Sequence, residues 1–306
     1  MLAIASNLVT TFQAIVLGAL QGVTELFPIS SLGHTVLFPH LFGWTNIVRW
    51  QSQPESPWLA FIVMLHVGSA IGLLIYFWRT WLALIKAFFV SIGRMIRLRR
   101  WSVETPDEHL IWLIVIASIP TGILGIALEH TARVATAKPL IAAIFLVVNG
   151  FILLGAERAR RLAEVRALAV REGISRYGDR DTNSLSYGEA AGLGFVQSTA
   201  LIAGISRDGI VMAGGLIRGL SNYDAGRFAF LLATPIILAA GIYKIGDLTG
   251  PLGAGVRGPA LIAASVAAFF AVITVAFLSR YLKRGNLMPF AIYCLLFGTA
   301  MIIYNA

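Results

Sequence analysis

Six apolar stretches, each close to the length needed to cross a bilayer, constrain this chain more than any other feature of its sequence. They cover residues 58–78, 110–128, 139–155, 228–246, 259–279 and 286–304. A helix needs about 20 apolar residues to span the hydrocarbon core. The composition agrees, because 58% of the 306 residues are hydrophobic and only 13% are charged, whereas soluble domains carry about 25% charged residues. We therefore predict an all-α integral membrane protein with six transmembrane helices.

Two further apolar stretches are interrupted. The first, 8–26, breaks at Phe27-Pro28, and the second, 188–203, breaks at Gly204. GALQGVTELFPISSLG, from residue 18, aligns without a gap with GFVQSTALIAGISRDG, from residue 194. The identical pairs are Gly18/Gly194, Gln21/Gln197, Ile29/Ile205, Ser30/Ser206 and Gly33/Gly209. Paired, interrupted hydrophobic segments are typical of inverted repeats with a site at the membrane midplane.

The distribution of cations agrees with two re-entrant hairpins. If each broken stretch enters and leaves on one side, the six spans place eighteen of the 24 Lys and Arg on one face, within 79–109, 156–187, 218–227 and 280–285. Such an excess marks the cytoplasmic face, so both chain termini are predicted outside. The net charge of +9 therefore does not indicate nucleic acid.

The expected organisation is one polytopic membrane domain over 1–306. Its repeat halves, approximately 1–155 and 187–306, are joined by an Arg-rich cytoplasmic segment, 156–186. The single cysteine, Cys294, excludes an internal disulfide.

The two breaks are expected to face each other, since non-helical backbone at membrane depth occurs only where protein or a watery cavity covers it. Ser30 and Ser206 stand where the N-cap of a following half-helix would stand. Helix N-termini carry about half a positive charge, so two of them aimed at one cavity make an anion site. Arg207 adds a planar donor fork that suits phosphate oxygens.

Acid–base groups gather in the first break. Glu25 follows Gln21 by four residues, so both project from one helix face. If the segment after the break is helical, the imidazole of His34 sits over the hydroxyls of Ser30 and Ser31. A hydroxyl beside a base is the minimum for covalent catalysis, and a carboxylate near phosphate can orient water, hold a divalent cation or move a proton.

Other polar residues admit a structural interpretation as well as a functional one. Asp208 either pairs with Arg207 or belongs to the site, and Gln197 either packs or mirrors Gln21 in binding substrate. The remaining histidines are expected to be interface or packing residues: His40, His66, His109 and His130.

Both interrupted stretches carry a family resemblance. QGVTELFPISSLGH, residues 21–34, resembles the (E/Q)GxTEFLPxSSxGH signature of bacterial undecaprenyl-pyrophosphate phosphatases of the bacitracin-resistance type. AGISRDGIVMAGG, residues 203–215, resembles their second signature, PGxSRSGxTxxxG. The resemblance covers nearly the whole chain. It implies the fold predicted above, and removal of the terminal phosphate from a C55 lipid pyrophosphate at the outer membrane face.

By this resemblance the catalytic positions are Glu25, Ser31, His34 and Arg207, with Gln21, Ser30 and Ser206 beside them. A divalent cation, Mg²⁺ or Ca²⁺, is implied only by the resemblance, with Glu25 and Gln21 as its candidate ligands. The chain departs from the signatures at Leu32, Ala203, Asp208 and Val211, and Gln21 is the less common choice at its position. Three hydroxyls are thereby missing near the site, and an acid stands beside Arg207.

The resulting hypothesis is a phosphatase of the bacterial cytoplasmic membrane that acts on a polyprenyl pyrophosphate and recycles the carrier lipid for envelope synthesis. Ser31 and His34 both stay open as the nucleophile. The alternative is a flippase or transporter that uses the same anion site, because inverted repeats with broken helices are a transporter design. The sequence shows neither a ring of charged residues nor a carbonyl-rich filter, so it does not favour a channel. The sequence leaves open whether the protein forms a homodimer.

Overall fold

The computed structural model describes residues 9–51, 53, 56–136, 138–169 and 180–305. Within these ranges the chain is helical, and the only β-type pairing is an isolated bridge between Arg180 and Leu220. The α-helices are α1 (Thr11–Thr24), α2 (Ser31–Leu41), α3 (Thr45–Gln51), α4 (Pro57–Tyr76), α5 (Trp78–Leu98), α6 (Pro106–Thr136), α7 (Pro139–Ala169), α8 (Tyr187–Gln197), α9 (Arg207–Ile217), α10 (Asn222–Tyr243), α11 (Ile245–Thr249), α12 (Arg257–Tyr281) and α13 (Met288–Asn305). Single 3₁₀ turns lie at Thr182–Ser184, Ser198–Leu201 and Pro251–Gly253.

The six predicted spans are confirmed as helices. Among the described residues, six helices are long and apolar enough to cross a membrane: Pro57–Tyr76, Pro106–Leu128, Pro139–Glu164, Asn222–Tyr243, Arg257–Tyr281 and Met288–Asn305. Local signals set several of their starts. For α4, the Ser56 side chain accepts from the Trp58 amide and Pro57 occupies the first turn, where its missing N–H costs nothing.

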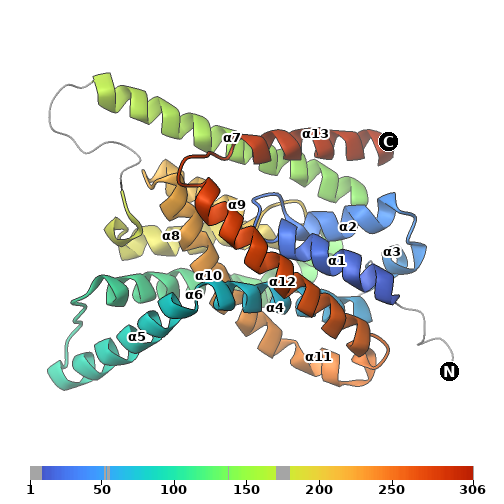
Figure 1. The fold of residues 1–306 in the computed structure, drawn as a ribbon, viewed down its shortest axis with the longest axis horizontal. Coiled ribbons are helices and arrows are strands. Elements are labelled where there is room, and N and C mark those ends of the chain that lie inside the picture. Colours follow the sequence, from blue (N-terminus) through green and yellow to red (C-terminus); the bar gives the residue numbers. More distant parts are fainter. Residues whose placement is uncertain (1–8, 52, 54–55, 137, 170–179, 306) are drawn as a thin grey trace.

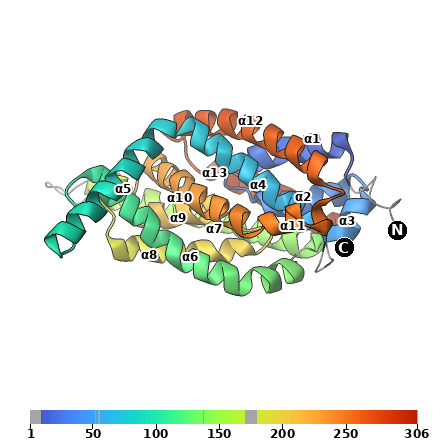
Figure 2. The ribbon, with the colours of Figure 1, turned by 90° about the horizontal axis from the view of Figure 1, so that it is seen from below.

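The helices lie roughly along the long axis of the molecule (Figure 1), and the view from below shows the same alignment (Figure 2). The α5–α6 connection and the end of α7 lie at the left of Figure 1, whereas α3, α11 and the C-terminus lie at the right. We call the left-hand end the basic end. Its cations include Arg94, Arg97, Arg99, Arg100, Arg158, Arg160, Arg161, Arg280, Lys283 and Arg284.

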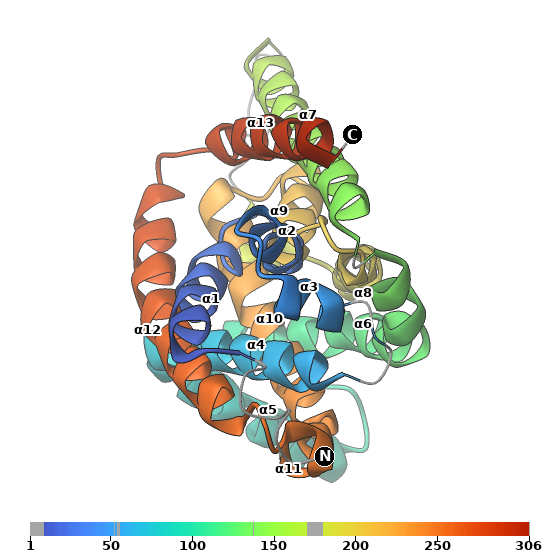
Figure 3. The same cartoon turned by 90° about the vertical axis from the view of Figure 1, so that its right-hand side faces the viewer.

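Short helices fill the middle of the assembly. Seen along the long axis, α2 and α9 lie near the centre, and α7, α13, α12, α4 and α6 lie around them (Figure 3). Helix α1 packs on α12 and α8 packs on α6. The breaks near Pro28 and Gly204 therefore meet inside the protein, where neighbouring helices cover their non-helical backbone.

Small residues allow the closest helix contacts. Gly18 of α1 lies against the backbone of Ala263 on α12, and Gly194 of α8 lies against the backbone of Ala117 on α6. A Cβ at either glycine would clash with the facing carbonyl oxygen. Close approach of this kind replaces the hydrophobic drive that membrane helices lack among themselves.

Two segments extend or refine the sequence prediction. Residues 80–93 belong to α5, a separate helix that follows Phe77 and ends at Leu98; its C-cap, Arg99, has a left-handed φ of 53°. Helix α7 continues past its apolar part to Ala169, because the Arg-rich sequence there is also rich in Ala, Leu and Glu, which favour helices. The predictions for residues 1–8 and for 170–179 of the Arg-rich segment lie outside the described residues.

Candidate active site

The candidate site is built on two helix N-termini that follow the two breaks. Ser30 precedes α2 and accepts from the Gly33 amide at 3.2 Å, and Ser206 precedes α9 and accepts from the Gly209 amide at 3.1 Å. The prediction that both serines are N-caps is therefore confirmed. Each short polar side chain satisfies a backbone donor that the first helical turn leaves unpaired.

One buried asparagine connects the two breaks. The Asn149 side chain, on α7, donates from Nδ2 to the Pro28 carbonyl and accepts from the Ser206 amide at Oδ1, both at 2.9 Å. Ser30 Oγ also accepts from the Gly204 amide at 3.1 Å. Because each bond joins segments far apart in sequence, the breaks are held in a fixed mutual position.

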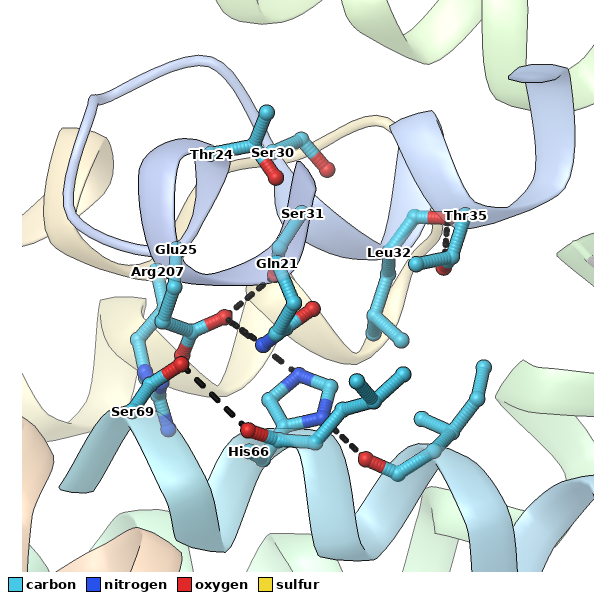
Figure 4. Close-up of polar contacts among 12 residues, drawn as sticks. Gln21, Thr24, Glu25, Ser30, Ser31, Leu32, Thr35, His66, Ser69 and Arg207 are labelled. Carbon is cyan, nitrogen blue, oxygen red and sulfur yellow. Dashed lines mark hydrogen bonds and ion pairs between the residues drawn. The ribbon is translucent and has the colours of Figure 1, made fainter. Parts of the chain in front are cut away.

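Around the Glu25 carboxylate, side chains from four helices converge (Figure 4). Gln21 of α1 donates from Nε2 to Oε2 at 2.9 Å, and the Ser31 hydroxyl at the start of α2 donates to the same oxygen. Arg207 of α9 donates from Nη2 to Oε1. His66 of α4 places Nε2 at 3.4 Å from Oε2. Glu25, Gln21, Ser31 and Arg207, predicted as site residues, thus form one cluster.

The charged side chains of this cluster and the neighbouring Asp208 are buried or partly buried, and some of their polar atoms have no hydrogen-bond partner within the described residues. Glu25 is 5% exposed and Asp208 only 1%. Arg207 Nε lies 3.9 Å from Asp208 Oδ1. Within the described residues, Arg207 Nε and both Asp208 oxygens have no hydrogen-bond partner. Such orphaned polar atoms are costly unless a ligand, ion or water completes them, so the guanidinium retains donor capacity for an anion.

His34 makes no described hydrogen bond to the Glu25 carboxylate or to the serine hydroxyls over which its ring was expected to sit. Nδ1 is 2.7 Å from the backbone oxygen of Ser30, and Nε2 is 2.8 Å from the hydroxyl of Tyr293 on α13. The ring also stacks with Tyr293 and Phe297. Helical periodicity correctly placed His34 one turn after Ser30, but packing against α13 decided where the ring points.

Gln197 is also outside the cluster. It is buried and donates to the Thr121 hydroxyl on α6 at 3.3 Å. Its position on α8 corresponds to Gln21 on α1, but no described contact joins it to Glu25.

The oxygen atoms of the cluster fit a hard divalent cation. Gln21 Oε1 is buried and has no hydrogen-bond partner within the described chain, and the Glu25 carboxylate lies beside its amide. Mg²⁺ is commonly held by one or two carboxylates together with substrate phosphates. No group of three or more His, Cys, Asp or Glu that could hold a metal occurs among the described residues.

Sequence reasoning missed three residues that the structure brings to the site: His66, Asn149 and Tyr293. His66 was expected to be an interface or packing residue, and its contact with Glu25 corrects that expectation. A polar residue inside an apolar span is a general signal of function, and it would have identified His66 and Asn149 as candidates without naming their partners.

Together, the fold and this cluster define a polytopic α-helical membrane protein with a buried carboxylate–guanidinium site between two broken helices. The chain belongs to the bacitracin resistance protein BacA family, which it matches over residues 14–300. It is 48% identical to undecaprenyl-diphosphatase of Mycolicibacterium paratuberculosis, over 96% of this chain and 97% of the relative. It is 44% identical to undecaprenyl-diphosphatase 2 of Frankia alni, over 94% and 96% respectively.

Proposed function

We propose that the protein hydrolyses undecaprenyl diphosphate to undecaprenyl phosphate and inorganic phosphate, and so recycles the carrier lipid for envelope synthesis. The observation that carries this proposal is the Glu25 carboxylate, which contacts both the Ser31 hydroxyl and the Arg207 guanidinium where the two breaks meet. Family membership and the relatives' names support a hydrolase. They do not favour a carrier without chemistry.

The proposed chemistry uses Ser31 as the nucleophile. Its hydroxyl already donates to Glu25, so the carboxylate can accept the proton as Oγ attacks the terminal phosphorus. The P–O bond to the bridging oxygen breaks, and the lipid monophosphate leaves. Water then hydrolyses the phosphoserine and releases phosphate. The His34 ring nitrogens are occupied by Ser30 and Tyr293, which favours Ser31 over His34.

Arg207 and the N-terminus of α9 would hold the phosphoryl oxygens, since both present donors to an anion. Ser30, Ser206 and Asn149 act by positioning, because their bonds fix the two breaks. Glu25 and Gln21 would hold a divalent cation. Bound there, it would supply neutralisation of the phosphate charge.

We further propose that α1–α2 and α8–α9 are re-entrant hairpins of an inverted repeat. Reciprocal contacts support this symmetry. The backbone at Gly33 approaches Gly204, and Gly209 approaches Pro28; in the repeat alignment, 28 corresponds to 204 and 33 to 209. Gly18 and Gly194, also equivalent, make the same kind of contact with α12 and α6.

The decisive experiment is phosphate release from the purified protein in detergent, with a long-chain polyprenyl diphosphate and with or without EDTA. We expect release by wild type, inhibition by EDTA, and loss in Arg207→Ala, Glu25→Gln and Ser31→Ala. Arg284→Gln, which removes an exposed cation at the basic end, should retain activity. If folded wild type binds the lipid without releasing phosphate, the hydrolase proposal is wrong and a lipid-phosphate carrier replaces it.

A further inference from the structure

A second polar pocket lies at the basic end, where α4, α10 and α12 come together. It is small, with a cavity volume of about 30 Å³. Tyr76, Tyr223, Arg227 and Ser279 contribute polar groups, and Phe77 and Phe230 contribute apolar walls. We call it the Arg227 pocket. Tyr76 follows His66 by ten residues of α4, which corresponds to about 15 Å of helix, so the pocket is separate from the Glu25 cluster.

The polar groups of this pocket are available to a ligand. Within the described chain, the Arg227 guanidinium has no hydrogen bond or ion pair, and the hydroxyls of Ser279, Tyr76 and Tyr223 have no hydrogen-bond partner. A guanidinium fork and three hydroxyls together offer several donors over a small volume. That arrangement suits a group with several acceptor oxygens.

The charged residues around the Arg227 pocket indicate the sign of the ligand's charge. No carboxylate lines the Arg227 pocket. The Lys283 ammonium lies over the Tyr223 ring, 5.5 Å from its centroid. The acid that follows Tyr223 in sequence, Asp224, is engaged as an acceptor from the Ser221 hydroxyl at 2.6 Å. Asp224 does not line the pocket, and Arg227 and Lys283 together outweigh its charge, so the surroundings favour an anion.

The rim of the pocket has the character of a membrane interface. Trp78 begins α5 directly after the pocket residue Phe77, and it is 52% exposed. The Arg79 guanidinium lies over the Trp78 ring, 5.2 Å from its centroid. Phe277, in the last turns of α12, is also exposed. Exposed Trp beside Lys and Arg is typical of the headgroup level of a bilayer. A lipid headgroup can thus reach the pocket laterally, and a free ion can reach it from water.

We propose that the Arg227 pocket is a binding site for a phosphate group, taken either from the headgroup of an anionic lipid or from free phosphate. Arg227 would hold two oxygens through its fork, and the Ser279 and tyrosine hydroxyls would hold the remaining oxygens. Phe77, which is partly exposed at the mouth of the pocket, would contact the carbon chain next to the headgroup. This inference does not depend on the hydrolase proposal.

The test measures binding by native mass spectrometry of the detergent-solubilised full chain, in the Arg207→Ala background, so that the Glu25 cluster does not contribute an anion site. The probes are phosphatidic acid, phosphatidylcholine and inorganic phosphate. We expect retention of phosphatidic acid that weakens about tenfold in Arg227→Gln, as for loss of a charge-assisted hydrogen-bonded contact. Ser279→Ala should weaken it several-fold with little risk to folding. Arg280→Gln, an exposed cation on the same helix end, is the matched control.

Competition by inorganic phosphate supports a site for the phosphate group from either source. Binding of phosphatidic acid without such competition supports the lipid headgroup as the source. If Arg227→Gln retains phosphatidic acid as well as the Arg207→Ala background protein does, the proposal is overturned. The proposal is also overturned if Arg280→Gln and Arg227→Gln lose phosphatidic acid binding to the same extent. Failure of all three probes to bind overturns it too. Turnover of the diphosphate is not the readout, so a failed hydrolase proposal would leave this result unaffected.

Discussion

Asp208 is the residue at which this site differs most in charge from the family signature it resembles, which has serine there. The side chain is almost fully buried beside Arg207, and its two oxygens have no hydrogen-bond partner within the described residues. The Asp208 carboxylate lies next to the guanidinium that would bind phosphate. The negative charges of the carboxylate and of the bound phosphate would therefore lie near each other. Like charges in such a position oppose binding.

We expect Asp208→Asn to lower KM for the polyprenyl diphosphate, since it removes a negative charge from beside the anion site and nearly preserves shape. An effect of about 1.4 kcal/mol would lower KM roughly tenfold. Steady-state phosphate release provides the measurement, with Asp181→Asn at the basic end as the control. An unchanged or raised KM would show that Asp208 does not face the bound anion.

At the scale of elements, α7 holds the two breaks together through Asn149. Its amide bonds both the Pro28 carbonyl and the Ser206 amide, although these groups belong to opposite halves of the chain. The geometry between Ser31 and Arg207 therefore depends on a residue that hydrogen-bonds to neither of them.

Asn149→Leu should destabilise the protein, because it leaves a buried carbonyl and a buried N–H unpaired, at about 1–3 kcal/mol each. It should also reduce activity, since the half-sites would no longer be held together. Thermal unfolding in detergent and phosphate release test these two effects. Asn305→Leu, at the end of α13, is the control. Wild-type stability in Asn149→Leu would contradict a connecting role.

A salt bridge between Arg180 and Glu189 lies at the start of α8, outside the six apolar spans. Hydrogen bonding from Arg180 lowers the pKa of Glu189 from its ordinary value of 4.5 to about 2. Because the folded pKa lies below the unfolded one, this bridge stabilises the fold above about pH 4.5 and is lost as pH falls through about 2. Arg180 also donates to the Arg218 carbonyl at 2.7 Å, so the bridge connects the start of α8 to the end of α9.

Glu189→Gln should lower the stability of the protein by about 1 kcal/mol near neutral pH, as for a partly exposed pair. At about pH 2, where the wild-type carboxylate is half protonated, the difference should shrink. Unfolding temperatures of both proteins at the two pH values give the comparison. If the difference in unfolding temperature between the two proteins does not change with pH, the Glu189 charge does not contribute to stability.

At the scale of the whole molecule, the basic end predicts orientation. Arg and Lys accumulate at the α5–α6 and α12–α13 connections and at the end of α7, and such an excess favours the cytoplasmic side. The sixth span then ends outside. The sole native cysteine, Cys294, is buried, so introduced cysteines can be labelled against a low background.

In a Cys294→Ser background, Asn305→Cys should react with a membrane-impermeant maleimide in intact spheroplasts. Arg284→Cys should react only after lysis, because it lies in the connection that precedes the opposite end of α13. Labelling both before and after lysis provides the internal control. The reverse pattern would invert the proposed topology.

Much of the architecture could be predicted without the structure. The number of spans follows from lengths of apolar sequence, and the breaks follow from Pro28 and Gly204, which interrupt helices through their own backbone chemistry. The N-caps at Ser30 and Ser206 follow from short-range hydrogen bonding. These features are local, so residue type and spacing are enough to determine them.

The partners of the site residues depend on the tertiary structure. Arg207 and Glu25 are 182 positions apart, and His34 and Tyr293 are 259 apart; helix packing brings each pair together. The same packing sends His34 to α13, brings His66 to Glu25 and aligns Asn149 with both breaks. The sequence by itself determined six spans, two broken helices and most of the residues that carry the chemistry. Only the tertiary structure decided which of them touch, because contact across the bundle depends on how whole helices pack.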